Sequence, residues 1–519
     1  MRYVTFRVDA STTMGIGHVM RCLTLAEGLR ESGVDSLFVC RAHHGNLCEL
    51  IGARGFTVEK LALLPVGAAA DSDAPKHVEW LGADWRIDVE QTLRAIAGVG
   101  GKPEWIVSDH YGVDHRWESA VRPSVARVMA IDDIADRRHD CDLLLDQNLV
   151  LGMEQRYVDR TPASAMQLLG PEYALLQPAY AELHEQAKAR AGAVRRILIF
   201  FGGGDAANLT GRSIAAFIGL QRSDIEADVV ITKAMVHAAA VREQIAGRAN
   251  IHLHTELPTL AHLILRADLA IGAGGATSWE RLCLGLPALV ITLADNQRPL
   301  AEGLQDNGFI QWLGHSDQVD VATLASKLAA IVDAGLDEAW SRKCLAAVDG
   351  RGMQRVRAAL LVDADAPLIA RAARAEDEQL LLVWANDPMT RRNAFTADAI
   401  SPEGHHRWFQ KRLSSPLQCR FFIVQTMDGV PIGQVRFDRS DEDGWIISYS
   451  VAPTFRARGC GRPVLHTALQ ALSSEQPGAS VLGLVKSANV QSRRIFESLG
   501  FSSRPREEPI VEYRLKLVS

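Results

Sequence analysis

The chain has 519 residues, more than the ~250–300 that one hydrophobic core supports, so several domains are expected. Its net charge of −6 and apolar content of 47% exclude a generally basic nucleic-acid-binding protein and a disordered chain. The eight cysteines form no C-x-x-C pair, and no uncharged apolar run approaches the ~20 residues of a membrane helix. The first residues include Asp9 and indicate a strand rather than a signal peptide. We therefore expect a cytoplasmic enzyme with reduced thiols, and neither nucleic acid nor membrane as a partner.

The first two-thirds of the chain repeats short apolar runs separated by helix-length segments, which predicts βαβ units and parallel sheets. Expected strands cover residues 4–8, 36–40, 105–108, 128–131 and 143–145, and then 196–201, 227–232, 250–254, 269–271 and 288–292. Two such sets predict two Rossmann-like domains, residues 1–175 and 176–360, with the loops at the strand C-termini lining a cleft.

The pattern changes beyond residue 360. Adjacent strands are expected at 421–426, 432–438 and 444–451, before a glycine-rich turn and an apolar helix. Adjacent strands without intervening helices indicate antiparallel pairing. We therefore expect a separate α+β domain at residues 366–519.

The loop after the first expected strand contains the densest chemistry. It includes Asp9, Gly15, Gly17, His18 and Arg21. Its glycines permit positive φ and close approach of backbone amides to a ligand, and a helix start favours anions. A dinucleotide fingerprint is incomplete, because Met20 stands where a third glycine is needed. His18 is a candidate general base, since a neutral imidazole accepts protons near pH 7; helix capping or packing is the alternative.

Two more glycine turns follow strands of the second set. They contain Gly203 and Gly204, and then Gly274, Gly275, Thr277 and Ser278. One such turn could be purely structural, but three at three strand ends favour ligand binding. Glu280 lies one turn into the next helix, where it could accept both hydroxyls of a ribose or simply stabilise the first turn.

These motifs, in this order, resemble the UDP-2,4-diacetamido-2,4,6-trideoxy-β-L-altropyranose hydrolase family of pseudaminic acid synthesis. The resemblance also includes Asp109 with Tyr111, Asp132-Asp133, and Asn296-Gln297, and covers most of residues 1–350. It implies a type-B glycosyltransferase-like fold that hydrolyses a UDP-sugar with inversion and without a metal. It implies that His18 is the catalytic base, that Asp109 and Tyr111 lie on the sugar side, and that Glu280 lies beside the uridine ribose.

A second motif follows the strand expected at residues 445–451. The turn contains Arg456, Arg458, Gly459, Gly461 and Arg462. Consecutive amides at a helix start form an anion nest, and arginines add positive charge, so the turn predicts a pyrophosphate site. An ordinary strand–helix turn with solvated arginines is the alternative.

This turn and the segment 485–501 resemble the acetyl-CoA-binding motifs of the GNAT acetyltransferases, over residues 367–519. The resemblance implies that Val451 pairs with pantetheine, that the turn holds the pyrophosphate, and that Asn489 contacts the cofactor arm. Many GNAT members have a tyrosine where this chain has Phe496, so the general acid is missing from that position. Tyr449, Ser492 and water are the candidates to replace it.

The front of this domain resembles the sugar-amine branch of the GNAT superfamily. In that branch, tryptophan, arginine and histidine regions line the acceptor pocket, which implies roles for Trp384, Arg392 and His406. A core tryptophan and surface basic residues are the alternatives.

Together the resemblances imply a bifunctional enzyme with UDP-sugar and acetyl-CoA as its small-molecule partners. It would acetylate the 4-amine of a UDP-4-amino-4,6-dideoxy-L-AltNAc-type sugar and hydrolyse the resulting UDP-diacetamido sugar. The alternatives are a glycosyltransferase fused to an acetyltransferase, because one fold hosts both chemistries, and a nonenzymatic nucleotide-sugar sensor.

Overall fold

The computed structural model describes residues 2–64, 74–203, 205–232, 235–255, 257–441, 444–506 and 509–518. The chain divides into two compact units, Met1–Val356 and Arg357–Ser519, and the boundary falls within helix α13 (Gly352–Leu361). Unit 2 therefore begins before the expected residue 366, because Ala358 and Val362 belong to its hydrophobic core. Within the described residues, no helix combines the length and apolar character needed to cross a bilayer.

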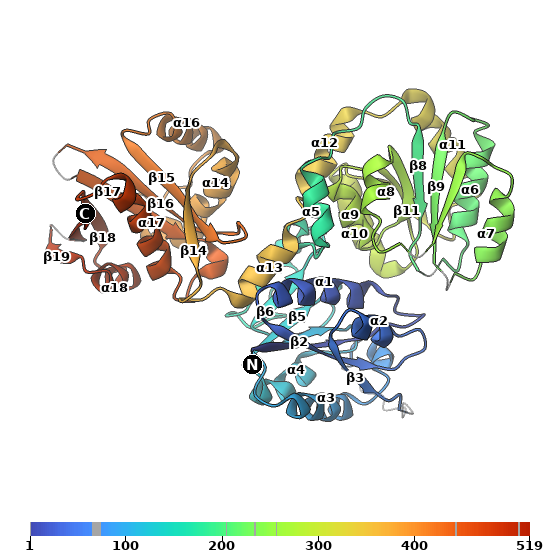
Figure 1. The fold of residues 1–519 in the computed structure, drawn as a ribbon, viewed down its shortest axis with the longest axis horizontal. Coiled ribbons are helices and arrows are strands. Elements are labelled where there is room, and N and C mark those ends of the chain that lie inside the picture. Colours follow the sequence, from blue (N-terminus) through green and yellow to red (C-terminus); the bar gives the residue numbers. More distant parts are fainter. Residues whose placement is uncertain are drawn as a thin grey trace. The chain divides into compact units, whose positions relative to one another are not determined.

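Unit 1 begins with a seven-stranded sheet of order β3-β2-β1-β4-β5-β6-β7, in which every neighbouring pair is parallel. Its strands are β1 (Tyr3–Val8), β2 (Asp35–Arg41), β3 (Thr57–Leu61), β4 (Trp105–Asp109), β5 (Arg127–Ile131), β6 (Leu143–Asp146) and β7 (Met166–Leu169). Helices α1 (Gly17–Glu31) and α2 (Cys48–Ala53) cover one face, and α3 (Trp85–Val99) and α4 (His115–Val121) cover the other (Figure 1). Every residue of β1 is buried, as a central strand covered on both faces requires.

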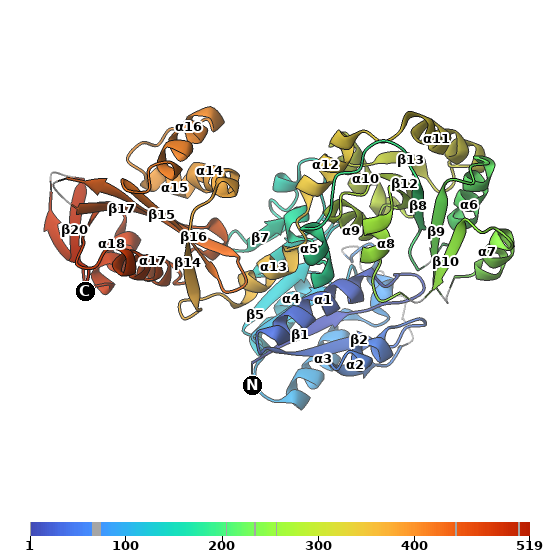
Figure 2. The same cartoon turned by 45° about the horizontal axis from the view of Figure 1, so that its top comes forward.

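A second parallel sheet follows, with six strands in the order β10-β9-β8-β11-β12-β13. Its strands are β8 (Arg196–Phe200), β9 (Glu226–Ile231), β10 (Ile251–Thr255), β11 (Leu269–Ala273), β12 (Ala288–Thr292) and β13 (Gln311–His315). Helices α6 (Leu209–Gly219), α7 (Ala238–Ile245) and α11 (Val321–Ala334) pack on one face. The other face is covered by α5 (Pro178–His184), α8 (Ala261–Arg266), α9 (Thr277–Cys283), α10 (Arg298–Asp306) and α12 (Glu338–Ala347) (Figures 1 and 2).

Both sheets reverse their strand order at one point, between β1 and β4 in the first and between β8 and β11 in the second. Ligands of doubly wound sheets bind outside the strand C-termini at such switch points. The three glycine loops predicted from the sequence follow β1, β8 and β11, so all three lie at switch points.

Unit 2 contains a mixed seven-stranded sheet of order β14-β15-β16-β17-β18-β20-β19. Its strands are β14 (Leu368–Ala372), β15 (Cys419–Thr426), β16 (Pro431–Ser440), β17 (Gly444–Val451), β18 (Ser480–Lys486), β19 (Ser502–Pro505) and β20 (Ile510–Lys516). Its helices are α14 (Glu378–Asn386), α15 (Pro388–Asn393), α16 (Pro402–Leu413), α17 (Gly461–Glu475) and α18 (Val490–Ser498). Helix α17 packs across β14 to β17. This is the separate α+β fold that the sequence predicts.

The only parallel pair described in this sheet, β17 with β18, separates before either strand ends. Their ladder stops at Ile447 opposite Gly483, whereas β17 continues to Val451 and β18 to Lys486. Gly483 lies against the ring of Phe496 on α18, and a Cβ there would approach that ring to 2.5 Å. The edge of β17 at residues 448–451 therefore faces β18 without pairing to it.

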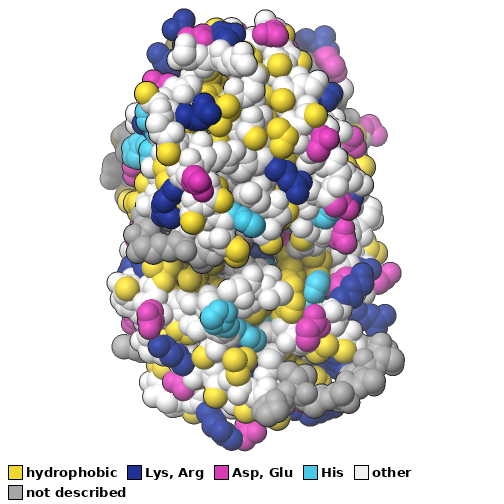
Figure 3. Space-filling view, turned by 90° about the vertical axis from the view of Figure 1, so that its right-hand side faces the viewer, with side chains coloured by type: hydrophobic (Ala, Val, Ile, Leu, Met, Phe, Trp, Pro, Cys, Tyr) yellow, Lys and Arg dark blue, Asp and Glu magenta, His cyan; other side chains and the backbone are white. Residues whose placement is uncertain are grey.

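The eight cysteines are all buried, and each is a free thiol. On the face shown in Figure 3, basic and acidic side chains are scattered among apolar and neutral ones. Among the described atoms of that face there is no continuous basic surface of the kind that binds nucleic acid.

Candidate functional sites

At the switch point of the first sheet, the loop after β1 and the end of β4 bring His18 next to Asp109. His18 Nδ1 lies 2.6 Å from Asp109 Oδ1. A carboxylate accepts at Nδ1–H and so fixes the tautomer that leaves a lone pair on Nε2. The His18 side chain is 11% exposed and that of Asp109 is fully buried, so Nε2 is the ring nitrogen left for a ligand.

Arg21, one helical turn after His18, holds the same carboxylate. Its Nε and Nη2 lie 2.6 Å from the two oxygens of Asp109, and Nη1 donates to Asp133 at 2.9 Å. Burial acts to raise the pKa of Asp109, but Arg21 and then His18 outweigh burial and hold this pKa well below its usual range. Arg21, predicted to bind substrate, is therefore a buried internal partner that keeps Asp109 ionised.

Tyr111 completes this group. Its ring packs edge-on against His18 with centroids 4.8 Å apart, and its hydroxyl donates to Asp133. Trp80, in the short helix η1 (Val78–Leu81), stacks on Tyr111 at 5.7 Å, and His77 lies 4.4 Å from Trp80. His77 and Trp80 are not predicted from the sequence, where only the spacing H-x-x-W points to them. They form an aromatic surface beside His18 on which the apolar face of a sugar could pack.

Asp9 does not join this group, although the sequence predicts that it contacts a ligand. It is 1% exposed, and its Oδ1 accepts from Arg7 at 2.7 Å and from the backbone of Arg41 at 2.6 Å. Asp9 thus ties β1 to β2 inside the domain, because the Arg7 guanidinium beside it needs a buried counter-charge.

The glycines of the first loop differ in their roles. Gly15 has φ +80° and its amide closes the turn onto Ser11 O at 2.8 Å, so this position requires glycine. A Cβ on Gly17, the first residue of α1, would meet no atom within 4 Å. Packing therefore gives no reason for glycine at position 17, whereas close approach of a ligand would.

In the loops of the second sheet, some of the predicted ligand-binding side chains already hydrogen-bond within the protein. Gly203 follows β8, and Gly204 lies outside the described residues. Ser278 is 1% exposed and accepts from Arg281 Nη2 at 3.0 Å, so its hydroxyl is an internal partner rather than a ligand contact. Gln297 caps its own loop by accepting from the backbone of Leu293 at 2.8 Å.

Part of the third loop stays open to a ligand. Gln297 is the nearest neighbour of the Gly275 position, whose Cβ would lie 3.8 Å from Nε2, and Asn296 is exposed. Gly274 packs against β12, and Thr277 begins α9, which has seven residues and therefore only a small dipole. Gly275, Thr277, Asn296 and Gln297 are thus the members of this predicted set that can meet a ligand.

Glu280 is a buried acid on α9. Burial raises its pKa to about 7, and the neighbouring Tyr180 hydroxyl and Arg281 offset part of that increase. Its Oε2 has no hydrogen-bond partner among the described residues. A half-protonated carboxyl with an unpaired oxygen can donate to or accept from a ligand hydroxyl.

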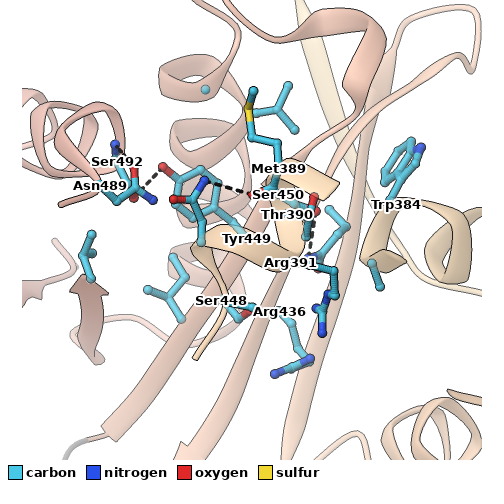
Figure 4. Close-up of a pocket in the computed structure, with 18 of the residues that line it drawn as sticks. Trp384, Met389, Thr390, Arg391, Arg436, Ser448, Tyr449, Ser450, Asn489 and Ser492 are labelled. Atoms are coloured by element: carbon cyan, nitrogen blue, oxygen red, sulfur yellow. Dashed lines mark hydrogen bonds between the residues drawn. The ribbon is translucent and has the colours of Figure 1, made fainter. Parts of the chain in front are cut away.

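A pocket of about 1110 Å³ lies in unit 2, between α14 to α16, the strands β16 to β18, and the starts of α17 and α18 (Figure 4). The predicted residues that line it are Trp384, Tyr449, Val451, Arg456, Gly459, Gly461, Arg462, Asn489 and Ser492. Residues 448–451, the edge of β17 that does not pair with β18, also line this pocket. This edge and the arginine turn therefore lie in one cavity.

Three predicted residues of unit 2 do not line the described pocket. Arg458 donates to the carbonyls of Ala359 and Leu360 and so anchors the end of α13. His406 is 60% exposed and pairs with Glu378, and Arg392 is exposed. The neighbours Arg391 and His405 line the pocket instead, because one residue along a helix turns a side chain by ~100°.

The arginine turn is built around two left-handed residues, Ala457 with φ 58° and Gly459 with φ 79°. Arg456 is used inside the protein, since it donates to Val451 O at 3.1 Å and pairs with Asp387. Arg462 is exposed at the start of α17 and has no ion pair within the described part of the chain. Arg462 is therefore the arginine of this turn that can meet an anion.

Tyr449 and Ser492 form a hydrogen-bonded pair in the pocket, with their oxygens 2.9 Å apart (Figure 4). Burial raises the pKa of Tyr449, which Ser492 offsets only in part, so the phenol stays protonated at neutral pH. Phe496 packs against Tyr449 with ring centroids 5.9 Å apart. Asn489 caps α18 by accepting from the Ser492 amide at 3.1 Å. The Tyr449 hydroxyl, a potential proton donor, thus belongs to a ring that packs against Phe496, the position where many GNAT members have tyrosine.

Comparison with known proteins agrees with this division. Residues 368–502 match the family model described as acetyltransferase (GNAT) domain. Over 95% of its length the chain is 21% identical to an uncharacterized protein of Methanocaldococcus jannaschii, 95% of which is covered. Over 59% of its length it is 22% identical to the UDP-2,4-diacetamido-2,4,6-trideoxy-beta-L-altropyranose hydrolase of Campylobacter jejuni, 97% of which is covered. It is 31% identical to the spore coat polysaccharide biosynthesis protein SpsG of Bacillus subtilis, over 37% of this chain and 57% of that protein.

Solved structures similar in fold include MurG of Acinetobacter baumannii, with 13% identity and a TM-score of 0.47 over 69% of this chain and 98% of that one. They also include the spermidine N-acetyltransferase of Vibrio cholerae, with 16% identity and a TM-score of 0.27 over 29% of this chain and 95% of that one. The chain joins a region similar to the hydrolase to a GNAT acetyltransferase domain, as its motifs predict. The two predicted Rossmann-like parallel sheets, followed by a GNAT domain, are confirmed.

Proposed function

We propose that the chain is a bifunctional enzyme of nucleotide-sugar metabolism. Unit 2 transfers the acetyl group of acetyl-CoA to the 4-amine of a UDP-4-amino-4,6-dideoxy-L-AltNAc-type sugar. Unit 1 hydrolyses the product, UDP-2,4-diacetamido-2,4,6-trideoxy-β-L-altropyranose, to the free sugar and UDP, a step of pseudaminic acid synthesis. Similarity to the Campylobacter jejuni hydrolase and the GNAT match support this pair of consecutive reactions.

The observation that supports hydrolysis most directly is the His18–Asp109 pair. Nε2 of His18 accepts a proton from water, whose oxygen attacks the anomeric carbon while the bond to the diphosphate oxygen breaks. Asp109 stabilises the imidazolium that forms, and Arg21 keeps Asp109 ionised. Attack opposite the leaving group inverts the anomeric centre. Loop amides at Gly203, Gly275 and Thr277, with Glu280 at the ribose, bind UDP without a metal.

The observation that supports acetyl transfer is the early end of the β17–β18 ladder inside the pocket. Its unpaired backbone edge fits the amide-rich pantetheine arm of acetyl-CoA, and Arg462 with the Gly459–Gly461 turn fits the pyrophosphate. Acetyl-CoA supplies the activated acyl group. Tyr449 donates its proton to the departing sulfur and is oriented by Ser492.

Tyr449→Phe tests the acid. It is expected to lower kcat for acetyl transfer about 10²–10⁴-fold while KM for acetyl-CoA stays unchanged. An unchanged kcat would assign the proton donor to another group.

Mass spectrometry of reactions with the intact chain tests the function. UDP-4-amino-4,6-dideoxy-L-AltNAc with acetyl-CoA is expected to give the UDP-diacetamido sugar first, and then the free sugar and UDP. The UDP-diacetamido sugar alone is expected to release UDP. Release only after an acceptor is added would identify a glycosyltransferase, and UDP binding without any turnover would identify a sensor.

A further inference from the structure

Transfer of an acetyl group to an amino sugar needs a base, because the ammonium form of the acceptor has no lone pair. Outside the arginines, the titratable side chains that line the described pocket are His405, Asp438, Tyr449, Cys460 and Lys486. Asp438 is already committed, since it pairs with Arg436 at 2.7 Å and with Arg412 at 2.9 Å. Lys486 is occupied as well, since its Nζ donates to the Arg392 carbonyl at 3.1 Å.

Two more candidates are removed by their protonation state. Burial raises the pKa of Cys460, whose thiol is fully buried, and also that of Tyr449. Both groups are therefore protonated at neutral pH and cannot accept a proton. Among these pocket-lining groups, His405 alone is left as a base.

His405 lies on α16 and is 2% exposed, yet neither Nδ1 nor Nε2 has a hydrogen-bond partner among the described residues. A buried polar atom without a partner costs about 1–3 kcal/mol, so such a residue in a pocket points to a ligand. The ring is held between aromatic neighbours, stacked on Phe409 at 5.8 Å and tilted against Trp408 at 5.4 Å.

The surroundings of His405 keep it neutral. Burial lowers its pKa, Glu378 on α14 acts in the opposite direction, and His406 on its own helix acts with burial. The groups that contact it from α16 are the aromatic rings of Trp408 and Phe409, and β15 contributes Phe421 to the same pocket. A neutral imidazole with both nitrogens free is ready to accept a proton.

We propose that His405 is the catalytic base of the acetyl transfer and takes the proton that the acceptor amine loses. An imidazole nitrogen of His405 takes one proton from the acceptor ammonium and so frees the nitrogen lone pair. The amine nitrogen then bonds to the acyl carbon, the carbon–sulfur bond breaks, and the sulfur takes the Tyr449 proton. The second proton, which the nitrogen loses as the amide forms, returns to the Tyr449 oxygen. This assignment rests on the proposed acetyltransferase function of unit 2.

The test is the pH dependence of kcat for wild type and His405→Gln, with the UDP-4-amino sugar as acceptor. Glutamine preserves polarity but cannot take a proton, so the variant depends on amine that solvent has already deprotonated. We expect a loss of about 10²–10⁴-fold at neutral pH that shrinks as the pH rises toward the amine pKa, with KM for acetyl-CoA unchanged. A loss of equal size at every pH, or no loss, would overturn the proposal.

Two other histidines provide matched variants. His466 is exposed on α17 and does not line the described pocket, so His466→Gln is expected to match wild type. His406→Gln separates the two neighbouring histidines, because a pH-dependent loss in that variant instead would reassign the base. Acetyl-CoA binding reports, in every variant, the folding of unit 2, which contains all three histidines. A wild-type chain that acetylates no amino sugar contradicts the proposed function. If the wild type transfers acetyl and H405Q has the same pH dependence of kcat, only the assignment of His405 as the base is contradicted.

Discussion

Asp109 connects every charged member of the first candidate site. It accepts from His18 and from two nitrogens of Arg21, and the same guanidinium reaches Asp133. Removal of this carboxylate therefore changes both the histidine tautomer and the balance of buried charge. The catalysis proposed for unit 1 and the stability of that unit are therefore coupled at this one residue.

Asp109→Asn is expected to lower kcat for UDP release about 10²–10⁴-fold, because an amide no longer holds the productive tautomer of His18. It should also lower the free energy of unfolding by about 3–5 kcal/mol, since the buried Arg21 loses its partner. UDP release assays and denaturant unfolding measure both effects. His18→Asn is the matched variant, with the activity loss but little loss of stability. An Asp109→Asn chain with wild-type activity would contradict the assigned base.

Glu280 predicts a pH dependence of stability. Its folded pKa of about 7 exceeds the ordinary glutamate value of 4.5, so the folded state favours the neutral acid. The stability it contributes is complete below pH 4.5 and is lost as the pH rises through 7, by an amount on the order of 3 kcal/mol. Urea unfolding between pH 4 and 8 should show this decline in wild type, and Glu280→Gln should lack it. Parallel curves for the two proteins would contradict the raised pKa.

At the level of residues, the sequence predicts which loops contain the sites but not which side chains face them. Glycine spacing and a histidine at a helix start single out His18, whereas its contact with Asp109 is seen only in the structure. Choosing His405 rather than the predicted His406 requires knowing which side of α16 faces the pocket, and the sequence has histidine at both positions. Asp9 is similar, because its buried partner Arg41 comes from a strand distant in sequence.

At the level of elements, the sequence predicts the central strands of both parallel sheets and misses β3, β7 and β13. Central strands are continuous apolar runs because both faces are covered, whereas these edge strands contain several exposed or half-buried residues. The early end of the β17–β18 ladder is equally hidden from the sequence, because both strands continue as extended segments beyond their last paired residues.

The arginine turn predicts two different phenotypes for two nearby residues. Arg462→Ala is expected to raise KM for acetyl-CoA about tenfold with little change in Tm, because one charge-assisted contact is lost. Arg458→Ala is expected to lower Tm with little change in KM, because its guanidinium holds the carbonyls at the end of α13. Steady-state kinetics and thermal unfolding of both variants distinguish the roles. A raised KM in Arg458→Ala and a lowered Tm in Arg462→Ala would instead assign pyrophosphate binding to Arg458.

At the level of the whole molecule, the boundary inside α13 determines what an isolated acetyltransferase unit needs. Ala358 and Val362 on α13 belong to the core of unit 2, and Arg357 pairs with Asp428. A fragment beginning at residue 366 lacks all three contacts, whereas one beginning at Gly352 keeps them.

We expect the fragment 366–519 to be less stable than 352–519 by about 2–4 kcal/mol, because two buried side chains are missing. Denaturant unfolding of both fragments measures the difference. Acetyl-CoA binding by the longer fragment serves as the control for its folding. Equal stability of the two fragments would show that unit 2 does not need α13 and begins after its end.

The burial of all eight cysteines has a practical consequence. Thiol-reactive dyes and spin probes react slowly with buried sulfur, so the native cysteines take up little label. One cysteine introduced on an exposed helix of each unit would then accept a donor and an acceptor fluorophore selectively. Energy transfer between them, measured with the proposed substrates, would report whether the two units approach one another between the proposed acetylation and hydrolysis steps.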